Sequence, residues 1–303
     1  MKEEFDMANN DILLHVENLK QYFKLPGKKV AKVINGVSFD VYRGEVFSLV
    51  GESGSGKSTI GKSIIRLNDP TDGKIIFDGI DIAGKLNKSQ IRDLRKNMQM
   101  IYQDPQASLN PRMTIGDIVA EGMDNYHLYR DREERDRKIQ DILLTVGLGP
   151  QYISKFPRNL SGGQKQRAGI ARSLIMDPKL IIADECISAL DVSVQAQVIN
   201  LLKDIQKQTG TAIIFIAHDL SMVKYISDRI GVLHRGYLLE VGTSEEIFTD
   251  PRHPYTKSLI DTIPTTNPIA EKLKHSAGYN YETSGLDYSK GVMKHVSGSH
   301  YVL

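Results

Sequence analysis

The amino-acid sequence predicts an α/β fold built on a mainly parallel sheet. In the second half of the chain, apolar runs at 180–183 and 212–217 flank an amphipathic stretch at 194–205. Strands that alternate with helices in this way form parallel sheets covered on both faces. A second observation is the apolar run at 45–50, which ends in a glycine-rich loop and leads into a helix expected from about Lys57.

Three stretches depart from this alternation. Residues 12–82 consist of β-branched and aromatic runs separated by glycine turns, which is typical of strands. Residues 114–173 have helical periodicity with Thr114 as an N-cap, so we expect a helical insert between strands. Beyond about Asn267 the chain is rich in Gly, Ser, Tyr, His and Lys, which predicts a loosely packed appendage.

Composition and charge narrow the class of protein. The 303 residues are 40% hydrophobic with a formal net charge of +2, which is ordinary for a globular protein and lacks the basic bias of nucleic-acid binders. The single cysteine, Cys186, excludes an intrachain disulfide and favours a reducing compartment. The polar first ten residues predict no signal peptide. The apolar runs are far shorter than the roughly 20 residues of a membrane-spanning helix.

A phosphate-binding loop is the clearest local motif. Residues 51–59 read GESGSGKST, which fits the spacing G-x-x-x-x-G-K-[ST] between a strand and a helix. The glycines let backbone amides turn toward a phosphate, Lys57 reaches its oxygens, and the Ser58 hydroxyl binds magnesium. The alternative is a glycine-rich turn that matches the motif by chance, but such a turn would not be expected to follow an apolar strand and open a helix. The residues expected to contact nucleotide here are Gly51, Ser53, Gly54, Ser55, Gly56, Lys57, Ser58 and Thr59.

Two acidic residues follow a second apolar strand. Residues 180–185 read LIIADE, and ligands of open α/β sheets bind at the carboxyl ends of strands. We therefore expect Asp184 to hold Mg²⁺, through water. Glu185 is expected to orient the attacking water or accept its proton. A solvated acidic turn is the simpler alternative, and the phosphate loop in the same chain weighs against it.

A second glycine-rich helix start lies at 160–164, which reads LSGGQ, with Ser161 as the cap of an anion-attracting helix end. Together with GESGSGKST and LIIADE, this motif makes the sequence resemble the ABC ATPase family, whose signature is LSGGQ, over about residues 12–264. The resemblance implies a P-loop NTPase core with a mainly parallel sheet. It also implies an N-terminal antiparallel β subdomain and an inserted helical subdomain at about 104–175.

The resemblance also implies roles for individual residues. Gln103 matches the family's Q-loop glutamine, Asp191 ends a match to the D-loop (SALD), and His218 follows a strand as the switch histidine does. Phe23, or its neighbour Tyr22, stands where an aromatic ring stacks on adenine. Both aromatic residues also fit a strand that needs core side chains, so this choice stays open.

In the family, two ATPase domains pack head-to-tail around ATP. Each ATP would lie between the phosphate loop of one domain and the signature of the other, here Ser161, Gly162, Gly163 and Gln164. The implied catalytic residues are Glu185, His218 and Gln103, and the implied magnesium ligands are Ser58, Gln103 and Asp184. The implied cofactors are therefore ATP and Mg²⁺.

The sequence after the ATPase core narrows the resemblance. Residues 251–256 read PRHPYT, which looks like the HPYT segment of oligopeptide and dipeptide importer ATPases, and most of all like the F-type subunits of oligopeptide permeases. Such subunits imply a heterodimer with a related D-type ATPase, two transmembrane permeases and, indirectly, an extracytoplasmic peptide-binding protein. The implied location is peripheral, on the cytoplasmic face of the cell membrane. We expect an ATPase domain at 1–265 and an appendage at 266–303.

Two departures from the family pattern matter. Many members carry cysteines after HPYT that hold an iron–sulfur cluster, and this chain has none there, so no such cluster is expected. Cys186 stands where the family usually has proline, which changes the turn after Glu185. Three alternatives remain: an importer ATPase for dipeptides, nickel or another small solute; a non-transport ABC ATPase, which usually has coiled coils or tandem ATPase domains; and a P-loop kinase, which would lack LSGGQ.

Overall fold

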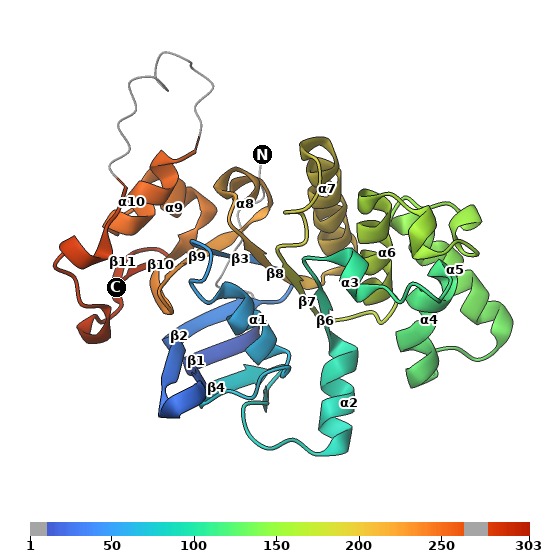
Figure 1. The fold of residues 1–303 in the computed structure, drawn as a ribbon, viewed down its shortest axis with the longest axis horizontal. Coiled ribbons are helices and arrows are strands. Elements are labelled where there is room, and N and C mark those ends of the chain that lie inside the picture. The colour runs from blue at the N-terminus through green and yellow to red at the C-terminus, as the bar shows by residue number, and fades with distance from the viewer. Residues whose placement is uncertain (1–10, 264–277) are drawn as a thin grey trace, which may run out of the picture. The chain divides into compact units, whose positions relative to one another are not determined.

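The computed structural model describes residues 11–263 and 278–303, and the chain forms two compact units. The first unit contains Met1–Lys85 and Phe215–Leu303, and the second contains Leu86–Ile214. Figure 1 labels most of the helices and strands of both units. The predicted boundary between residues 265 and 266 lies outside the described residues.

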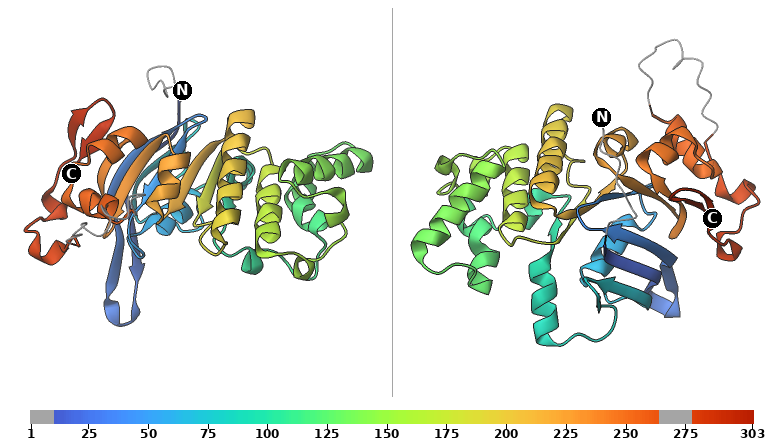
Figure 2. Two further views of the ribbon diagram at one scale, coloured as in Figure 1. Left: turned by 90° about the horizontal axis from the view of Figure 1, so that it is seen from above. Right: turned by 180° about the vertical axis from the view of Figure 1, so that it is seen from behind.

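The first unit begins with a four-stranded antiparallel sheet in the order β2-β1-β4-β5. Its strands are β1 (Ile12–Lys24), β2 (Val30–Tyr42), β4 (Asp72–Phe77) and β5 (Ile80–Asp81). Alternate apolar residues such as Leu14 and Val16 are fully buried, as the two-residue period of a strand requires. The hairpin of β1 and β2 forms a long ribbon, in blue, that turns at η2 (Pro26–Lys28) (Figure 2). The predicted N-terminal antiparallel subdomain is confirmed.

A second group of strands in this unit carries the phosphate loop. Strand β9 (Arg229–His234) pairs in parallel with β3 (Val46–Val50) and antiparallel with β10 (Tyr237–Thr243). Both β3 and β9 are buried along their whole length, and the buried residues of β9 include the polar side chains at its two ends, Arg229 and His234. The helices of this unit are α1 (Lys57–Ile64), α8 (Leu220–Ile226), α9 (Ser244–Thr249) and α10 (Pro254–Asp261).

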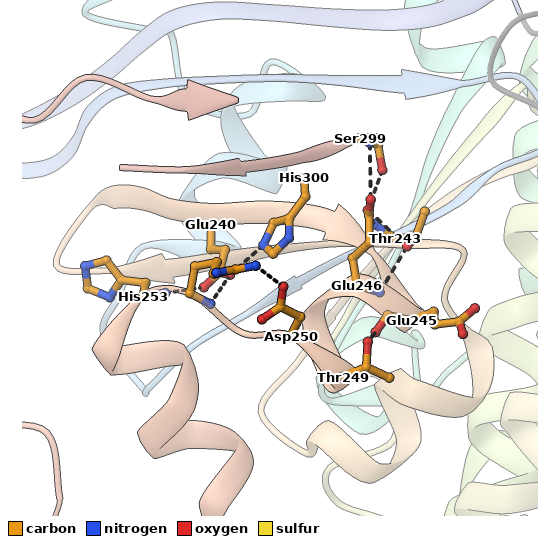
Figure 3. A network of polar contacts seen from close by, with 10 residues as sticks. Glu240, Thr243, Glu245, Glu246, Thr249, Asp250, His253, Ser299 and His300 are labelled. Carbon is orange, nitrogen blue, oxygen red and sulfur yellow. Dashed lines mark hydrogen bonds and ion pairs between the residues drawn. The ribbon is translucent and has the colours of Figure 1, made fainter. Parts of the chain in front are cut away.

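The end of the chain is packed against β10. The elements after the gap are η5 (Tyr281–Thr283), η6 (Tyr288–Lys290), β11 (Lys294–Ser297) and β12 (His300–Val302). Strand β12 pairs antiparallel with β10, and the buried His300 Nε2 lies 2.6 Å from Oε1 of the buried Glu240 (Figure 3). Ser299 donates from its hydroxyl to Glu246 at 2.8 Å. The prediction of a loosely packed appendage is therefore wrong for residues 278–303, because short strands and buried polar pairs replace the missing apolar periodicity.

The second unit combines two parallel strands with the predicted helices. Strands β6 (Met98–Ile101) and β7 (Leu180–Asp184) are parallel neighbours. The helices are α2 (Lys88–Asn97), α3 (Pro105–Ser108), α4 (Ile115–Tyr126), α5 (Arg132–Thr145), α6 (Gly162–Leu174) and α7 (Val192–Thr209), with short turns η3 (Pro150–Tyr152) and η4 (Pro157–Asn159). Helices α4, α5 and α6, in green, contact one another (Figure 2).

Local capping explains where these helices begin and end. Thr114 accepts a hydrogen bond from the Asp117 amide at 3.2 Å and so starts α4 as predicted. Gly210 ends α7 in the left-handed conformation that glycine tolerates. Strand β8 (Ala212–Ala217) begins in the second unit and ends in the first. In the described ranges, none of the helices combines the length and apolar character that a membrane crossing would require.

Candidate functional site

The phosphate loop follows β3 in the first unit and depends on glycine at two tight positions. Gly51 has φ +148°, and a Cβ there would lie 2.0 Å from the carbonyl oxygen of Leu233. Gly56 has φ +107°, and a Cβ there would lie 2.5 Å from Cδ1 of Ile34. The positive φ is strained for any other residue at both positions, and at Gly51 a Cβ would also collide with backbone, so the fold requires these two glycines.

Lys57 lies at the first turn of α1 and is almost fully buried. Its ammonium group donates to the carbonyl oxygens of Gly51, at 2.7 Å, and Glu52, at 2.8 Å. The N-cap of α1, Gly56, makes no side-chain capping bond, and the N-terminus of a helix favours an anion through its dipole and its amides. A buried cation and a helix N-terminus at the same loop are what a phosphate group requires.

The strand positions of the two aromatic candidates differ. Gln21 on β1 accepts a hydrogen bond from Ser63 of α1, at 3.3 Å, so its face of the strand is directed toward the helix after the phosphate loop. In a regular strand Phe23, two residues on, would share that face, and Tyr22, with Lys32 5.6 Å from its ring, would be on the other. The pairing of β1 with β2 is irregular between Gln21 and Tyr22, so strand alternation alone does not choose between Phe23 and Tyr22.

Gln103 and Glu185 follow the carboxyl ends of two neighbouring parallel strands, β6 and β7. Ile101 of β6 is opposite Ala183 of β7, so the residues two positions further along, Gln103 and Glu185, come together. Nε2 of Gln103 donates to Oε2 of Glu185 at 3.0 Å. Glu185 has φ +46°, which is uncommon outside glycine and is found preferentially at functional sites. Asp184, one residue earlier, is largely buried.

The signature motif forms the N-terminus of α6. The Gln164 amide donates to the Ser161 hydroxyl at 3.3 Å, and the Ser161 amide donates to Oε1 of Gln164 at 3.0 Å. This reciprocal capping box fixes the turn. A Cβ on Gly163 would lie 2.6 Å from Val194 of α7, so glycine is required there as well. Ser161 and Gly162 are exposed, which leaves this helix end accessible to a ligand.

The predicted site residues fall into two sets, each within one unit. The first unit holds Phe23, Gly51, Ser53, Gly54, Ser55, Gly56, Lys57, Ser58, Thr59 and His218. The second unit holds Gln103, Ser161, Gly162, Gly163, Gln164, Asp184, Glu185 and Asp191. His218, which follows β8, and Asp191, the residue before α7, are both exposed.

Two residues near these sets have features that the motifs alone do not reveal. Burial raises the pKa of the Cys186 thiol to about 12, and the negative charge of Asp184 adds to this effect. Tyr255 of α10 accepts a hydrogen bond at its hydroxyl from the Glu52 amide of the phosphate loop, at 3.0 Å. In the sequence, Tyr255 stood out only as part of the HPYT segment, and its contact with the phosphate loop was not predicted. The available signal was that a buried tyrosine hydroxyl needs a polar partner.

Comparisons with known families match the motifs just described. Residues 34–188 match the family described as "ABC transporter". Residues 239–289 match the family described as "Oligopeptide/dipeptide transporter, C-terminal region". The second match includes β10, α9, α10 and the first elements of the tail.

Characterised relatives cover nearly the whole chain. The chain is 48% identical over 292 residues to the oligopeptide transport ATP-binding protein OppF of Bacillus subtilis (strain 168), which covers 96% of this chain and 95% of that protein. It is 50% identical over 292 residues to the dipeptide transport ATP-binding protein DppF of Lactococcus lactis subsp. cremoris (strain MG1363), covering 96% of this chain and 93% of that protein.

Solved structures share the fold. The structure of cbiO1 from Clostridium perfringens, part of the ABC transporter complex cbiONQ, matches with a TM-score of 0.70 and 29% identity, over 79% of this chain and 92% of that one. The ATP-binding cassette MJ0796, a dimer bound to ADP and Pi, matches with a TM-score of 0.69 and 27% identity, over 76% of this chain and 98% of that one. These likenesses confirm the predicted P-loop NTPase fold.

Proposed function

The chain belongs to the ABC transporter family of ATP-hydrolysing proteins, and from this premise we propose that it powers the import of oligopeptides. The observation that carries the proposal is the match at residues 239–289 to the C-terminal region of oligopeptide and dipeptide transporters. The identity to OppF across both units supports it. Dipeptide import is the second candidate, because DppF of Lactococcus lactis is equally similar.

The phosphate loop is proposed to bind the triphosphate of ATP. The amides at the start of α1 attract the anion, and Lys57, held by the carbonyls of Gly51 and Glu52, directs its remaining donor to the β- and γ-phosphate oxygens. Ser53, Gly54, Ser55 and Thr59 complete the loop around the phosphates. Phe23 is the proposed adenine-stacking residue, on the strand whose Gln21 bonds to Ser63 of α1.

Glu185 is proposed as the general base for the attacking water. The Gln103 amide donates to one of its carboxylate oxygens and leaves the other free to accept a proton from water. His218 is proposed to contact the γ-phosphate. These three residues are the proposed catalytic set, and Gln103 also links the site to the permeases.

The chain offers oxygen ligands that suit magnesium, which prefers carboxylate and hydroxyl oxygens. Ser58, Gln103 and Asp184 are the proposed ligands, with Asp184 acting through water. When bound, Mg²⁺ neutralises charge on the phosphates.

We propose that two ATPase subunits close head-to-tail on ATP. The exposed Ser161, with Gly162, Gly163 and Gln164, binds the ATP held by the partner's phosphate loop, and Asp191 lies in the loop at that interface. The proposed partner is a related D-type ATPase, with two transmembrane permeases and, indirectly, a peptide-binding protein outside the cytoplasm. The proposed location is the cytoplasmic face of the cell membrane.

Peptide uptake in cells that lack the chain tests this function. Wild-type protein should restore uptake of a labelled hexapeptide, whereas dipeptide uptake alone would favour the second candidate. Glu185→Gln should keep ATP binding but lower hydrolysis by about 100-fold or more, the usual scale of general-base catalysis. Lys57→Ala should weaken nucleotide binding itself. Wild-type turnover in Glu185→Gln would show that Glu185 is not the base.

A further inference from the structure

One peptide group of the phosphate loop is hydrogen-bonded at both ends. The carbonyl oxygen of Gly51 accepts from Nζ of Lys57 at 2.7 Å. The amide of the same peptide group, the N–H of Glu52, donates to the hydroxyl of Tyr255 at 3.0 Å. Rotation of this peptide plane would break both bonds together. The orientation of the carbonyl that holds Lys57 therefore depends on a side chain 203 residues further along the chain.

Tyr255 is itself held in a fixed place. It is 1% exposed, and its ring stacks on the ring of His234 with centroids 4.2 Å apart. His234 is the last residue of β9, directly after Leu233, whose carbonyl would be 2.0 Å from any Cβ at Gly51. The end of β9 thus touches both the first residue of the loop and the tyrosine that bonds to the next residue.

The C-terminal segment closes around the same tyrosine. The Tyr288 hydroxyl lies 3.0 Å from Nδ1 of His234 and 2.9 Å from the Tyr279 hydroxyl. The Tyr279 ring meets the Tyr255 ring edge-on, with centroids 5.5 Å apart. His234 and Tyr288 are also nearly fully buried. Aromatic contacts of this kind restrict a ring to one orientation, so the hydroxyl of Tyr255 has little freedom to leave the Glu52 amide.

We propose that Tyr255 is a positioning residue for the phosphate loop, acting through the Gly51–Glu52 peptide on Lys57. The proposal deepens the ATP-binding role given above and rests on it. The Tyr255 hydroxyl keeps the Gly51 carbonyl directed toward Lys57, so that the ammonium group lies beside the phosphate site before nucleotide binds. Preorganisation of a binding group raises affinity because the ligand does not have to order it.

A purely structural role for Tyr255 makes a different prediction. If the ring only fills the core, Tyr255→Phe keeps the packing and changes nothing at the loop. If the hydroxyl acts through Lys57, its loss weakens nucleotide binding, and the effect disappears once the lysine is gone. A double-mutant cycle separates these two cases, since it isolates the coupling between two side chains.

The test measures the affinity of the full-length chain for trinitrophenyl-ATP by fluorescence. We expect Tyr255→Phe to weaken binding about fivefold, the effect of one hydrogen bond of ordinary strength, and to raise the KM for ATP with kcat within about twofold. In a Lys57→Ala background the same change should be smaller than twofold. The matched control, Tyr126→Phe, removes a hydroxyl that donates to the Arg92 carbonyl in the second unit, and it should bind nucleotide as the wild type does.

A second measurement needs no variant. Hydrogen exchange of the wild-type protein should show a protected Glu52 amide, and rapid exchange at that amide would overturn the proposal. Wild-type affinity in Tyr255→Phe, or an equal loss in both lysine backgrounds, would overturn it too. These failures differ from a failure of the proposed function, in which Lys57→Ala itself would bind nucleotide as tightly as the wild type.

Discussion

His253 caps α10 only while its ring is neutral. Its Nδ1 accepts a hydrogen bond from the Tyr255 amide at 3.1 Å, and a protonated ring has no acceptor. Burial lowers the pKa of His253 to about 4, although the Glu240 carboxylate opposes this shift and His234 adds to it. Above pH 6.5 the ring is neutral in both the folded and the unfolded chain. Between pH 6.5 and 4 only the unfolded chain binds the proton, so the free energy of unfolding falls as the pH falls.

We therefore predict that His253→Asn flattens this part of the pH profile. Asparagine is a good N-cap acceptor and does not titrate, so the cap survives at low pH. In the wild type, the titration of His253 lowers the free energy of unfolding by roughly 3 kcal/mol at most. Urea unfolding at pH 7 and pH 4.5 measures the difference between the two proteins. An identical drop in both would show that His253 does not control it.

Cys186 is predicted to react slowly with alkylating reagents. The thiol is 1% exposed, and burial raises its pKa to about 12, so almost none of it is the nucleophilic thiolate at neutral pH. Mg-ATP should slow the reaction further by closing the site. Cys186→Pro, the residue usual in the family, should hydrolyse ATP and resist the reagent. Mass spectrometry of labelled protein with and without Mg-ATP is the measurement, and rapid labelling of the native chain would contradict this prediction.

For single residues, the sequence predicted contacts whose two partners lie close together in the chain. The Ser161 cap of α6 follows from the local motif, because its hydroxyl accepts from the Gln164 amide only three residues away. The Tyr255 hydroxyl bond to Glu52 did not follow, because nothing in a local pattern reports which amide a tyrosine reaches across 203 residues.

Strand β12 is attached to β10 by a buried ionisable pair, and we predict that this pair stabilises the C-terminal segment. His300 and Glu240 are each at most 1% exposed, and Glu240 also accepts from the backbone amides of Arg252 and His253 (Figure 3). His300→Ala would leave the buried carboxylate without its side-chain partner, at a cost of about 3 kcal/mol.

Chemical denaturation measures this cost, with His295→Ala as the control. His295 is an exposed histidine on the neighbouring strand β11 and should change stability by about 0.5 kcal/mol or less. Equal losses from His300→Ala and His295→Ala would mean that the pair with Glu240 does not hold the segment.

Strand β12 also shows why some helices and strands were predicted from the sequence and others were not. Long amphipathic helices such as α7, and buried runs such as β7 and β8, carry enough periodic residues to be recognised. Strand β12 has three residues, and its place depends on polar pairs with β10 and α9. Two or three residues cannot show a period, so the sequence did not predict the strand at His300–Val302.

At the scale of the whole molecule, the chain carries both halves of the proposed ATP site. The phosphate loop belongs to the first unit, and the signature at the start of α6 belongs to the second, with Ser161 and Gly162 exposed. A helix N-terminus that is accessible and capped only by its own box can bind the phosphates of a partner's nucleotide. The related cassette MJ0796 is a dimer in its ADP- and Pi-bound structure.

We predict that the chain dimerises on ATP with a related D-type ATPase rather than with itself. Binding that is stronger in the closed state drives closure, and slowed hydrolysis in Glu185→Gln should make that state accumulate. Light scattering after size exclusion with Mg-ATP should therefore give a heterodimer when the partner is present and a monomer when it is absent. Ser161→Arg should abolish dimerisation while the chain still binds nucleotide, whereas Ser89→Arg, an exposed control on α2, should not. A stable ATP-dependent homodimer that supports peptide uptake without a second ATPase would contradict the pairing, because both half-sites would then be sufficient within one kind of chain.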